Sequence, residues 1–458
     1  MGATSVRTVF ITSFHGLVSR VLESGVIAKL VEENVSIVIL VPEFKKSYFE
    51  ETFGRYRQVE VVGVSRSSLS RMDGYFHALT FPLLHTKTMS IIRRSHRGYR
   101  HRYQLFLAEI FAGVIGRFRM GRELFRSLNA ALVPSVFNTL FETYKPSLVF
   151  STDMKDPLDS QLLLEAKRRG ITTVGMVRSW DYLTGKGVVR VKPERVIVHN
   201  EIIKKEAKDY IDVSSDAISV VGIPHYDPYV NEKRSSREMF SARVGLDPKR
   251  PFIFLAPWGD KFSDTDTEVL QILCRAFADG RLPKDLQVLV RLPPSDTLAA
   301  SEKVPCGNIV FDVPGKQFEG RHVKANEMTY DDLLHLADSL YWSTLVVSSA
   351  STIAIDAAVF DKPVVLTAFD GRREKPYYES VKQYFDFNHV RNLLATGGVR
   401  VAENESVFIE AVKNYLTDPH QDRNGRVRIV REQCLILDGK ASERLVALLM
   451  KELNARVL

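Results

Sequence analysis

Two hydroxyl residues and one acid, Ser351, Thr352 and Asp356, have the types and the spacing needed to hold a phosphorylated ligand. They belong to the stretch SSASTIAIDAAVFDKPVV (348–365), which follows an apolar run and predicts a turn, a helix and a strand. The start of a helix binds anions through backbone N–H groups, and Asp356 follows one turn later, where it can accept from a ribose hydroxyl. An ordinary Ser/Thr-capped helix has the same pattern. We expect a nucleotide diphosphate here, with Ser349 contributing a further hydroxyl.

Two loops in the N-terminal half carry groups suited to proton transfer. His15 follows the predicted strand 8–12 and can act as a general base or bind an anion. Asp181 lies beside Trp180 in a later loop, where an apolar setting would raise the pKa of its carboxyl group into a useful range. Arg178 in the same loop is a candidate to position a phosphate or an acidic acceptor. Capping or core roles are the structural alternatives for these residues.

Two loops in the C-terminal half are further candidates for the donor site. Trp258 and Lys261 follow the predicted strand 251–256, and Arg291 stands at the end of the next strand, where it can neutralise a diphosphate. The acids of Asp264-Thr265-Asp266 resemble a metal-binding DxD, but they lead into a helix, which favours capping. We therefore predict no metal.

The elements that position these loops alternate along the chain as strands and helices, which predicts two facing Rossmann-like α/β domains with parallel sheets. The 458 residues also exceed what a single core supports. We expect an N-terminal, acceptor-side domain at 1–230 with a helical insertion at about 66–142. A nucleotide-donor domain at 231–438 and a C-terminal helix at 439–458 follow. The candidate loops would then lie at the carboxyl ends of the strands, facing a cleft.

Composition excludes several classes of protein. The three cysteines are scattered without a CxxC spacing, which argues against a disulfide framework and a cysteine zinc site and favours a reducing cytosol. No apolar stretch reaches the length of a membrane span, and no secretory leader pattern opens the chain. A P-loop, a GxGxxG after the first strand, an HExxH and a GxSxG are all missing from the sequence. Transfer from a nucleotide-activated donor remains open, since it needs a base and positive dipoles only.

The net charge of +8 is concentrated in one segment. Between Arg93 and Arg126 there are nine arginines and two acids, with aromatic residues interleaved. Such a segment can lie on an anionic membrane surface or hold a polyanionic acceptor. A solvated arginine-rich helix face is the alternative, and the sequence has no nucleic-acid-binding signature.

Five stretches together resemble the GT-B glycosyltransferases, and within them the surface-carbohydrate group related to the CDP-glycerol glycerophosphotransferases. The stretches are VRSWDYLTGKG, GIPHYDPY, SSASTIAIDAAVFDKPVV, FDFNHVRNLLATGGVRVA and REQCLILDGKASERL. They cover the chain from about residue 177 onward, and the first 150 residues match only in their βα rhythm. The resemblance is more specific for the superfamily than for the substrate.

The resemblance implies a donor held mainly by the C-terminal domain, with Ser351 and Thr352 on its phosphates and Asp356 near its ribose. Pro224, His225 and Asp227 would belong to a hinge-side GxPxxD element, in which we assign His225 to positioning the acceptor or a phosphate. The segment from Asp438 to Arg444 would close the second domain.

One departure concerns the donor. The glycerophosphotransferases carry His-Gly in the loop where this chain has Trp180-Asp181. That difference favours sugar transfer, with Asp181 or His15 as the base, over a CDP-glycerol donor.

We therefore expect a metal-independent, cofactor-free glycosyltransferase that moves a sugar from a nucleotide-activated donor to a cell-surface glycan or lipid-linked acceptor. We expect a cytoplasmic protein that the basic segment can hold at the inner face of the membrane. Three alternatives stay open: a CDP-glycerol-type glycerophosphotransferase, a non-hydrolysing sugar-nucleotide 2-epimerase, and a catalytically silent glycan-binding or scaffold member of the fold.

Overall fold

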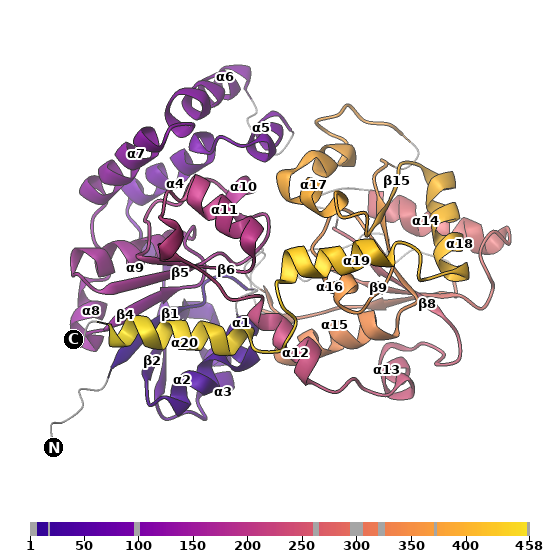
Figure 1. Ribbon diagram of the computed structural model, residues 1–458, viewed down its shortest axis with the longest axis horizontal. Coiled ribbons are helices and arrows are strands. Elements are labelled where there is room, and N and C mark those ends of the chain that lie inside the picture. Colours follow the sequence, from indigo (N-terminus) through magenta and orange to yellow (C-terminus); the bar gives the residue numbers. More distant parts are fainter. Residues whose placement is uncertain are drawn as a thin grey trace. The chain divides into compact units, whose positions relative to one another are not determined.

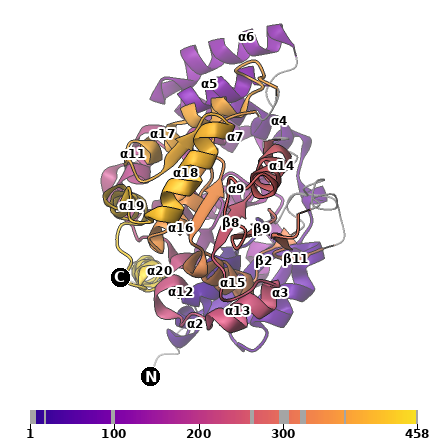
Figure 2. The ribbon, with the colours of Figure 1, turned by 90° about the vertical axis from the view of Figure 1, so that its right-hand side faces the viewer.

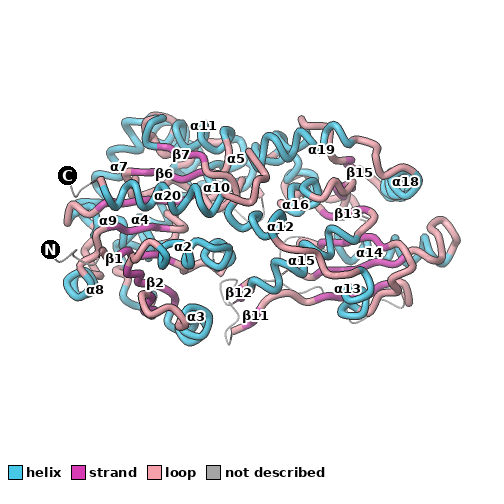
Figure 3. The backbone as a smooth tube through the Cα atoms, turned by 60° about the horizontal axis from the view of Figure 1, so that its bottom comes forward, coloured by secondary structure: helices cyan, strands magenta, loops and turns pink. Residues whose placement is uncertain are grey.

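A computed structural model describes residues 7–16, 19–95, 101–259, 265–293, 306–318, 326–370 and 373–455. The chain divides into two compact units. Unit 1 comprises Met1–Val230 and Leu437–Leu458, and unit 2 comprises Asn231–Ile436. Each unit contains a parallel sheet with helices on both of its faces (Figures 1 and 3).

Unit 1 is built on a seven-stranded parallel sheet with the order β3-β2-β1-β4-β5-β6-β7. The strands are β1 (Thr8–Thr12), β2 (Ser36–Pro42), β3 (Val59–Val64), β4 (Leu148–Ser151), β5 (Thr172–Met176), β6 (Arg195–Val198) and β7 (Ile218–Val220). Every residue of β2 after Ser36 is buried. Helices cover both faces of such a sheet, so its central strands are continuous apolar runs rather than alternating patterns.

The helices of unit 1 cover this sheet and form the insertion between β3 and β4. They are α1 (Ser19–Val21), α2 (Ile27–Glu32), α3 (Lys46–Phe53), α4 (Arg71–Leu83), α5 (Lys87–Arg94), α6 (Arg102–Ile110), α7 (Arg119–Leu132), α8 (Asn138–Tyr144), α9 (Pro157–Arg168), α10 (Tyr182–Gly185), α11 (Glu201–Tyr210), α12 (Asp227–Asn231) and α20 (Ala441–Asn454). The expected helical insertion is confirmed, since α4 to α8 fill it. None of the described helices is long and apolar enough to cross a bilayer.

The insertion shows less positive charge at its surface than its composition predicted. Arg93 is buried and pairs with Glu109 at 3.4 Å. Arg122 and Arg126 are also buried, and both bind the Asp212 carboxylate, at 2.5 and 2.7 Å. Arg93 therefore joins α5 to α6, and Arg122 and Arg126 attach α7 to the rest of unit 1, so none of the three faces an anionic surface.

The terminal helix α20 belongs to unit 1, although the resemblance implied that its segment closes the second domain. The backbone N–H groups of Ala441 and Ser442 donate to the Asp227 carboxylate at 2.9 and 2.7 Å. The first N–H groups of a helix lack partners within the helix, so Asp227 supplies the acceptors that α20 needs. Arg444 adds a hydrogen bond of 2.8 Å to the Val221 carbonyl. Figure 1 shows α20 (yellow) lying across the strands of unit 1.

Unit 2 is built on a six-stranded parallel sheet with the order β10-β9-β8-β13-β14-β15, beside a two-stranded antiparallel pair. The strands of the larger sheet are β8 (Phe252–Ala256), β9 (Gln287–Arg291), β10 (Ile309–Asp312), β13 (Leu345–Ser348), β14 (Val364–Thr367) and β15 (Arg400–Ala402). The pair consists of β11 (Lys316–Gln317) and β12 (Asn326–Glu327).

The helices of unit 2 lie on both faces of the larger sheet. They are α13 (Arg237–Val244), α14 (Thr265–Ala278), α15 (Tyr330–Trp342), α16 (Ile353–Val359), α17 (Asn388–Leu394), α18 (Glu405–Thr417) and α19 (Arg423–Ile429). One hydrophobic core joins α14 and α18 to β8, β9, β13 and β14. On the other face, Phe240 of α13 stacks on Phe252 of β8 at 5.8 Å. Figures 1 and 2 show α14 and α15 on opposite sides of the strands.

Candidate functional site

Each sheet has one point at which the strand order reverses, and ligands of open α/β sheets bind at the carboxyl ends of the strands there. In unit 1 this point lies between β1 and β4. The loops after both strands are tied together, because the Thr152 hydroxyl donates to the Thr12 carbonyl at 2.7 Å. His15 lies in the loop after β1, as the sequence predicted.

The loops after β4 and β5 form the polar centre of this edge. Asp153 accepts a hydrogen bond of 2.8 Å from Arg178 Nε and one of 2.7 Å from the Tyr182 hydroxyl. Burial opposes the charge of Arg178, but Asp153, Tyr182 and Asp181 together outweigh burial and raise the pKa of the guanidinium. Burial raises the pKa of Tyr182 well above its usual value, so its phenol stays neutral. Arg178 is thus a permanent cation fixed by Asp153.

Asp181 stands at the beginning of α10, close to a second cation. Its carboxylate accepts from the Ser179 hydroxyl at 2.6 Å and pairs with Lys186 Nζ at 2.9 Å, with 29% of its side chain exposed. Burial lowers the pKa of Lys186. The carboxylate is therefore oriented and partly accessible, an arrangement that suits a base acting on an acceptor hydroxyl.

The prediction from the sequence did not include two titratable residues that lie beside Asp181, namely Lys155 and Glu206. Burial, followed by the charge of Lys186, lowers the pKa of Lys155 to about 7. Burial, with a further contribution from Asp181, raises the pKa of Glu206 on α11 to about 8. Both groups therefore exchange protons near neutrality, as general acids and bases must.

The position of Lys155 offered a signal that the sequence reasoning did not use, because TDMKD (152–156) directly follows the apolar strand β4. Glu206 gave no such signal. It lies within α11, and only the packing of α11 against α10 brings it to this edge.

His225 lies deeper, after β7, and faces His199 with 6.5 Å between the ring centroids. Burial, followed by the charge of Arg20, lowers the pKa of both rings, that of His199 to about 4. A neutral His225 can donate or accept a hydrogen bond but offers a phosphate no charge. Its Nδ1 and Arg20 Nε are buried without a hydrogen-bond partner among the described residues. The role predicted for His225 stays a prediction.

In unit 2 the strand order reverses between β8 and β13, and the predicted donor loops follow these two strands. Trp258 follows β8, and Ser349, Ser351 and Thr352 follow β13, so the structure brings these four residues to one edge. The Asp266 carboxylate accepts from the N–H groups of Trp258 and of the next residue at 2.8 and 2.9 Å. This acid therefore shapes the loop. The described residues contain no cluster of metal-binding side chains.

Aromatic rings extend this edge beyond the predicted residues. The ring of Tyr384 meets the Trp258 indole edge-to-face at 4.4 Å. The Tyr384 hydroxyl is buried without a hydrogen-bond partner in the described part of the chain. Trp258 and Tyr384 thus form an apolar wall with one polar group, at the edge where the loop after β8 lies.

Three other predicted donor residues have different surroundings. Asp356 is buried within α16, and its charge adds to the burial that raises the pKa of the Cys434 thiol. Arg291 is buried and pairs with Asp312, and its Nη2 donates to the Asp332 carbonyl at 3.2 Å. Lys261 lies outside the described residues. The ligand contacts proposed for these three stay predictions, and the proposal below does not depend on them.

Residues 177–451 match the family described as CDP-Glycerol:Poly(glycerophosphate) glycerophosphotransferase. The chain belongs to this family. The match covers more than half of the chain and includes Arg178, Asp181 and every predicted donor loop, whereas the loops after β1 and β4 precede it. Family membership favours the glycerophosphotransferase alternative over the sugar transfer that the sequence led us to expect.

Two curated relatives match parts of the chain. A lipid-A-disaccharide synthase of Persephonella marina is 25% identical over 211 residues, 45% of this chain and 51% of that protein. A teichoic acid glycerol-phosphate primase of Bacillus spizizenii is 24% identical over 177 residues, 39% of this chain and 40% of that protein. The chain thus spans about half the length of the first relative and less of the second.

Solved structures match almost the whole chain. The wall teichoic acid polymerase TagF aligns with a TM-score of 0.53 at 13% identity, covering 99% of this chain and 90% of that chain. A putative UDP-N-acetylglucosamine 2-epimerase from Listeria monocytogenes aligns with a TM-score of 0.58 at 10% identity, covering 98% and 96%. At such identities the likeness shows the fold alone, and it confirms the expected GT-B-like class.

Proposed function

We propose that the protein transfers glycerol phosphate from CDP-glycerol to a hydroxyl of a phosphodiester-linked acceptor chain, as in the synthesis of teichoic-acid-like polymers. The family match over residues 177–451 carries this proposal. In the reaction the acceptor oxygen forms a bond to the phosphorus that bears glycerol. The bond between that phosphorus and the bridging oxygen breaks, CMP leaves, and the proton of the hydroxyl passes to a base.

The carboxyl edge of unit 2 binds the donor in this proposal. The hydroxyls of Ser351 and Thr352 contact the diphosphate, and Trp258 with Tyr384 offers an apolar wall to the nucleoside. Two observations support these roles: the loops lie at the reversal of strand order, and Thr352 is exposed at the start of α16.

The carboxyl edge of unit 1 binds and deprotonates the acceptor in this proposal. Asp181 takes the proton of the attacking hydroxyl, and Arg178 attracts the phosphate nearest to that hydroxyl. The partly exposed, hydrogen-bonded carboxylate of Asp181 supports the first role. The permanent charge of Arg178 supports the second.

A donor panel tests the proposal. The purified protein is incubated with CDP-glycerol or UDP-N-acetylglucosamine, with and without a short glycerol-phosphate oligomer, and nucleotide release and chain length are followed by chromatography and mass spectrometry. We expect acceptor-dependent release of CMP and lengthening by glycerol phosphate units. Thr352→Val should weaken donor binding about tenfold through one lost hydrogen bond to a charged group. Absence of CMP release with every acceptor would refute the proposal.

Sugar transfer is the second candidate, because Trp180-Asp181 stands where the resemblance implies His-Gly. The same panel distinguishes the two reactions. Release of UDP together with a glycosylated acceptor would favour sugar transfer, and interconversion of the UDP-sugar without an acceptor would indicate an epimerase.

We also propose that the insertion lies on an anionic membrane surface. Apolar side chains are exposed along its helices: Tyr103, Phe106, Leu107, Ile110, Phe111, Val114, Met120, Leu124, Leu128 and Leu132. The exposed Arg102, Arg117 and Arg119 lie among them. An apolar face rimmed by cations suits a bilayer interface that carries negative lipids.

A further inference from the structure

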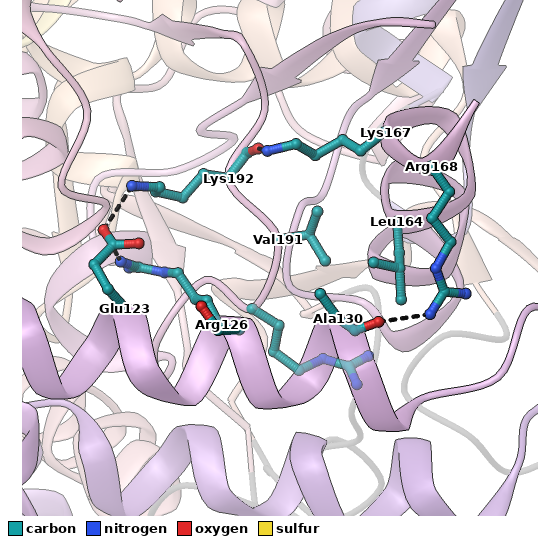
Figure 4. A pocket seen from close by; sticks show the side chains of 10 residues that line it. Glu123, Arg126, Ala130, Leu164, Lys167, Arg168, Val191 and Lys192 are labelled. Atoms are coloured by element: carbon teal, nitrogen blue, oxygen red, sulfur yellow. Dashed lines mark hydrogen bonds and ion pairs between the residues drawn. The ribbon is translucent and has the colours of Figure 1, made fainter. Parts of the chain in front are cut away.

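Unit 1 contains a cavity of about 350 Å³ that no step of the proposed reaction uses. Its walls come from α7, the last turns of α9 and the segment before β6 (Figure 4). In a βαβ unit the helix returns from the carboxyl edge of the sheet to the amino edge, so the last turn of α9 and the residues before β6 lie toward the amino edge. The cavity is therefore distinct from the edge that carries Asp181.

Five cations and one carboxylate line this cavity. The cations are Arg126, Lys167, Arg168, Arg190 and Lys192, and the carboxylate is Glu123. Glu123 pairs with Lys192 at 2.6 Å and with Arg126 at 3.1 Å. Figure 4 shows these three at one end of the cavity and Arg168 reaching the Ala130 carbonyl at the other.

The acids behind the wall do not balance the positive charge. Asp212 pairs with Arg126, but it is shared with Arg122, which adds another cation. Asp73 pairs with Arg190 at 3.3 Å. Lys167 donates one hydrogen bond of 3.0 Å, to the Lys192 carbonyl, and none to a carboxylate of the described residues. Burial and then the charge of Lys192 lower the pKa of Lys167, and the opposing charges of Glu194 and Glu123 do not cancel this shift.

Arg190 is the strongest sign of a ligand. Its side chain is 2% exposed, and its Nη1 faces Asp73 and Asn129. Its Nε and Nη2 are buried without a hydrogen-bond partner among the described residues. Burial lowers the pKa of this guanidinium. Buried donors of a charged group are costly unless an acceptor meets them. Neither atom has surface open to the cavity, so an oxyanion reaches them when the side chain turns toward it, and it then supplies two acceptors in the geometry of the guanidinium fork.

We propose that this cavity binds a phosphate ester group, at a second binding site separate from the donor and proton-transfer residues. Arg190 and Lys167 contact its oxygens, and Lys192 and Arg126 provide the surrounding charge. The molecule that carries this phosphate follows from the proposed function: if that function holds, the phosphate belongs to a repeat of the acceptor chain. A lipid headgroup carries the same chemistry, and the exposed stripe of Met120, Leu124 and Leu128 on α7 would bring it near.

The experiment measures binding of three probes to the full chain by titration calorimetry: inorganic pyrophosphate, a glycerol-phosphate oligomer, and vesicles containing phosphatidylglycerol. The double variant Lys167→Gln/Lys192→Gln removes two charges from the cavity. Ser127→Trp narrows it without a change in charge, since Ser127 lines it and is exposed. Lys208→Gln, in the last turn of α11 and outside the cavity, is the matched control. Thermal unfolding confirms that each variant is folded.

We expect both cavity variants to weaken binding of the oligomer by about tenfold or more, with binding to Lys208→Gln unchanged. A loss limited to vesicle binding would support the phosphate site and assign it to lipid. Wild-type binding in both cavity variants, or no binding of any probe to the wild type, would overturn the inference.

The readouts also separate this inference from the proposed function. If cavity-dependent binding occurs without CMP release from CDP-glycerol, the proposed function fails and the site stands. Normal CMP release with unchanged binding in the cavity variants refutes the site and leaves the function intact.

Discussion

One carboxylate organises the residues at the carboxyl edge of the unit 1 sheet. Asp153 holds both Arg178 and Tyr182, and Lys155 Nζ lies 4.5 Å from the centroid of the Tyr182 ring. The neighbouring Asp181 is held by Ser179 and Lys186. Charges of both signs are thus fixed in place before substrate binds, which is how electrostatic preorganisation lowers a barrier.

Asp181→Asn is expected to reduce kcat for acceptor-dependent CMP release by about 10²- to 10⁴-fold, because the amide cannot take the proton of the acceptor hydroxyl. The dissociation constant of CDP-glycerol should not change. Stopped-flow and equilibrium binding measurements give the two values. Asp209→Asn, on the exposed part of α11, is the matched control. A variant with near-normal kcat would remove Asp181 from the role of base.

Glu206 makes stability depend on pH with a defined sign. Burial raises the pKa of its carboxyl group from 4.5 to about 8, so the native protein keeps a proton that the unfolded chain releases. Stability therefore falls as pH rises from about 4.5 to about 8. Glu206→Gln removes this titration. Urea unfolding should therefore show that the free energy of unfolding of the variant rises relative to that of the wild type across this pH interval.

Lys155 makes stability depend on pH with the opposite sign. Burial lowers the pKa of its ammonium group from 10.5 to about 7, so its contribution to stability increases as the pH rises above 7. This contribution is present in both proteins and cancels in the comparison. Parallel pH curves for wild type and Glu206→Gln would contradict the assignment to Glu206.

At the scale of elements, the strands could be predicted from the sequence and several contacts could not. Buried parallel strands appear as short apolar runs, and the loops after them follow from the chain direction. This located the loops of His15, Asp181, Trp258 and Ser351. The burial of Arg122 and Arg126 depends on Asp212, which is 90 residues from Arg122 in the sequence, so the composition of the segment could not identify this partner.

The beginning of α20 depends on Asp227 in the same way, through contacts across more than 200 residues. Asp227→Ala is expected to lower the free energy of unfolding of unit 1 by about 1–2 kcal/mol, the usual cost of losing a helix N-terminal acceptor. Chemical unfolding and hydrogen exchange at residues 441–445 measure it. Asp227→Asn should retain part of the effect, and an equal loss in both variants would mean that the charge, not the acceptor geometry, matters.

The exposed stripe on α7 predicts a second result at this scale. Leu124→Glu and Leu128→Glu should each reduce co-sedimentation with phosphatidylglycerol vesicles severalfold, because a carboxylate would enter the apolar part of the interface. Val407→Glu, at an exposed apolar position on α18, serves as control. Binding of the wild type should weaken as salt is raised, and binding that does not respond to salt would argue against a contribution from the arginines.

For the whole molecule, the two sheets have separate hydrophobic cores. If the donor binds unit 2, CDP-glycerol at 100 times its dissociation constant should stabilise that unit by about 2.7 kcal/mol. Hydrogen exchange with mass spectrometry should then show protection concentrated in β8, β13 and the loops that follow them. Equal protection of both sheets would contradict a donor site confined to unit 2, and Thr352→Val should diminish the effect.

The path of the chain between the units affects how the protein is made. Unit 1 is interrupted at residue 230, and its helix α20 is translated only after the whole of unit 2. Domains fold as they leave the ribosome, so unit 2 can reach its native state before α20 is synthesised. At that stage the sheet of unit 1 lacks the helix that covers it, and the Asp227 carboxylate lacks the two N–H groups that α20 supplies. During this interval the growing chain exposes apolar surface on unit 1. Slow translation of residues 231–436, or a stop codon ahead of α20, would therefore leave a substrate for chaperones and proteases, even with the whole of unit 2 already folded.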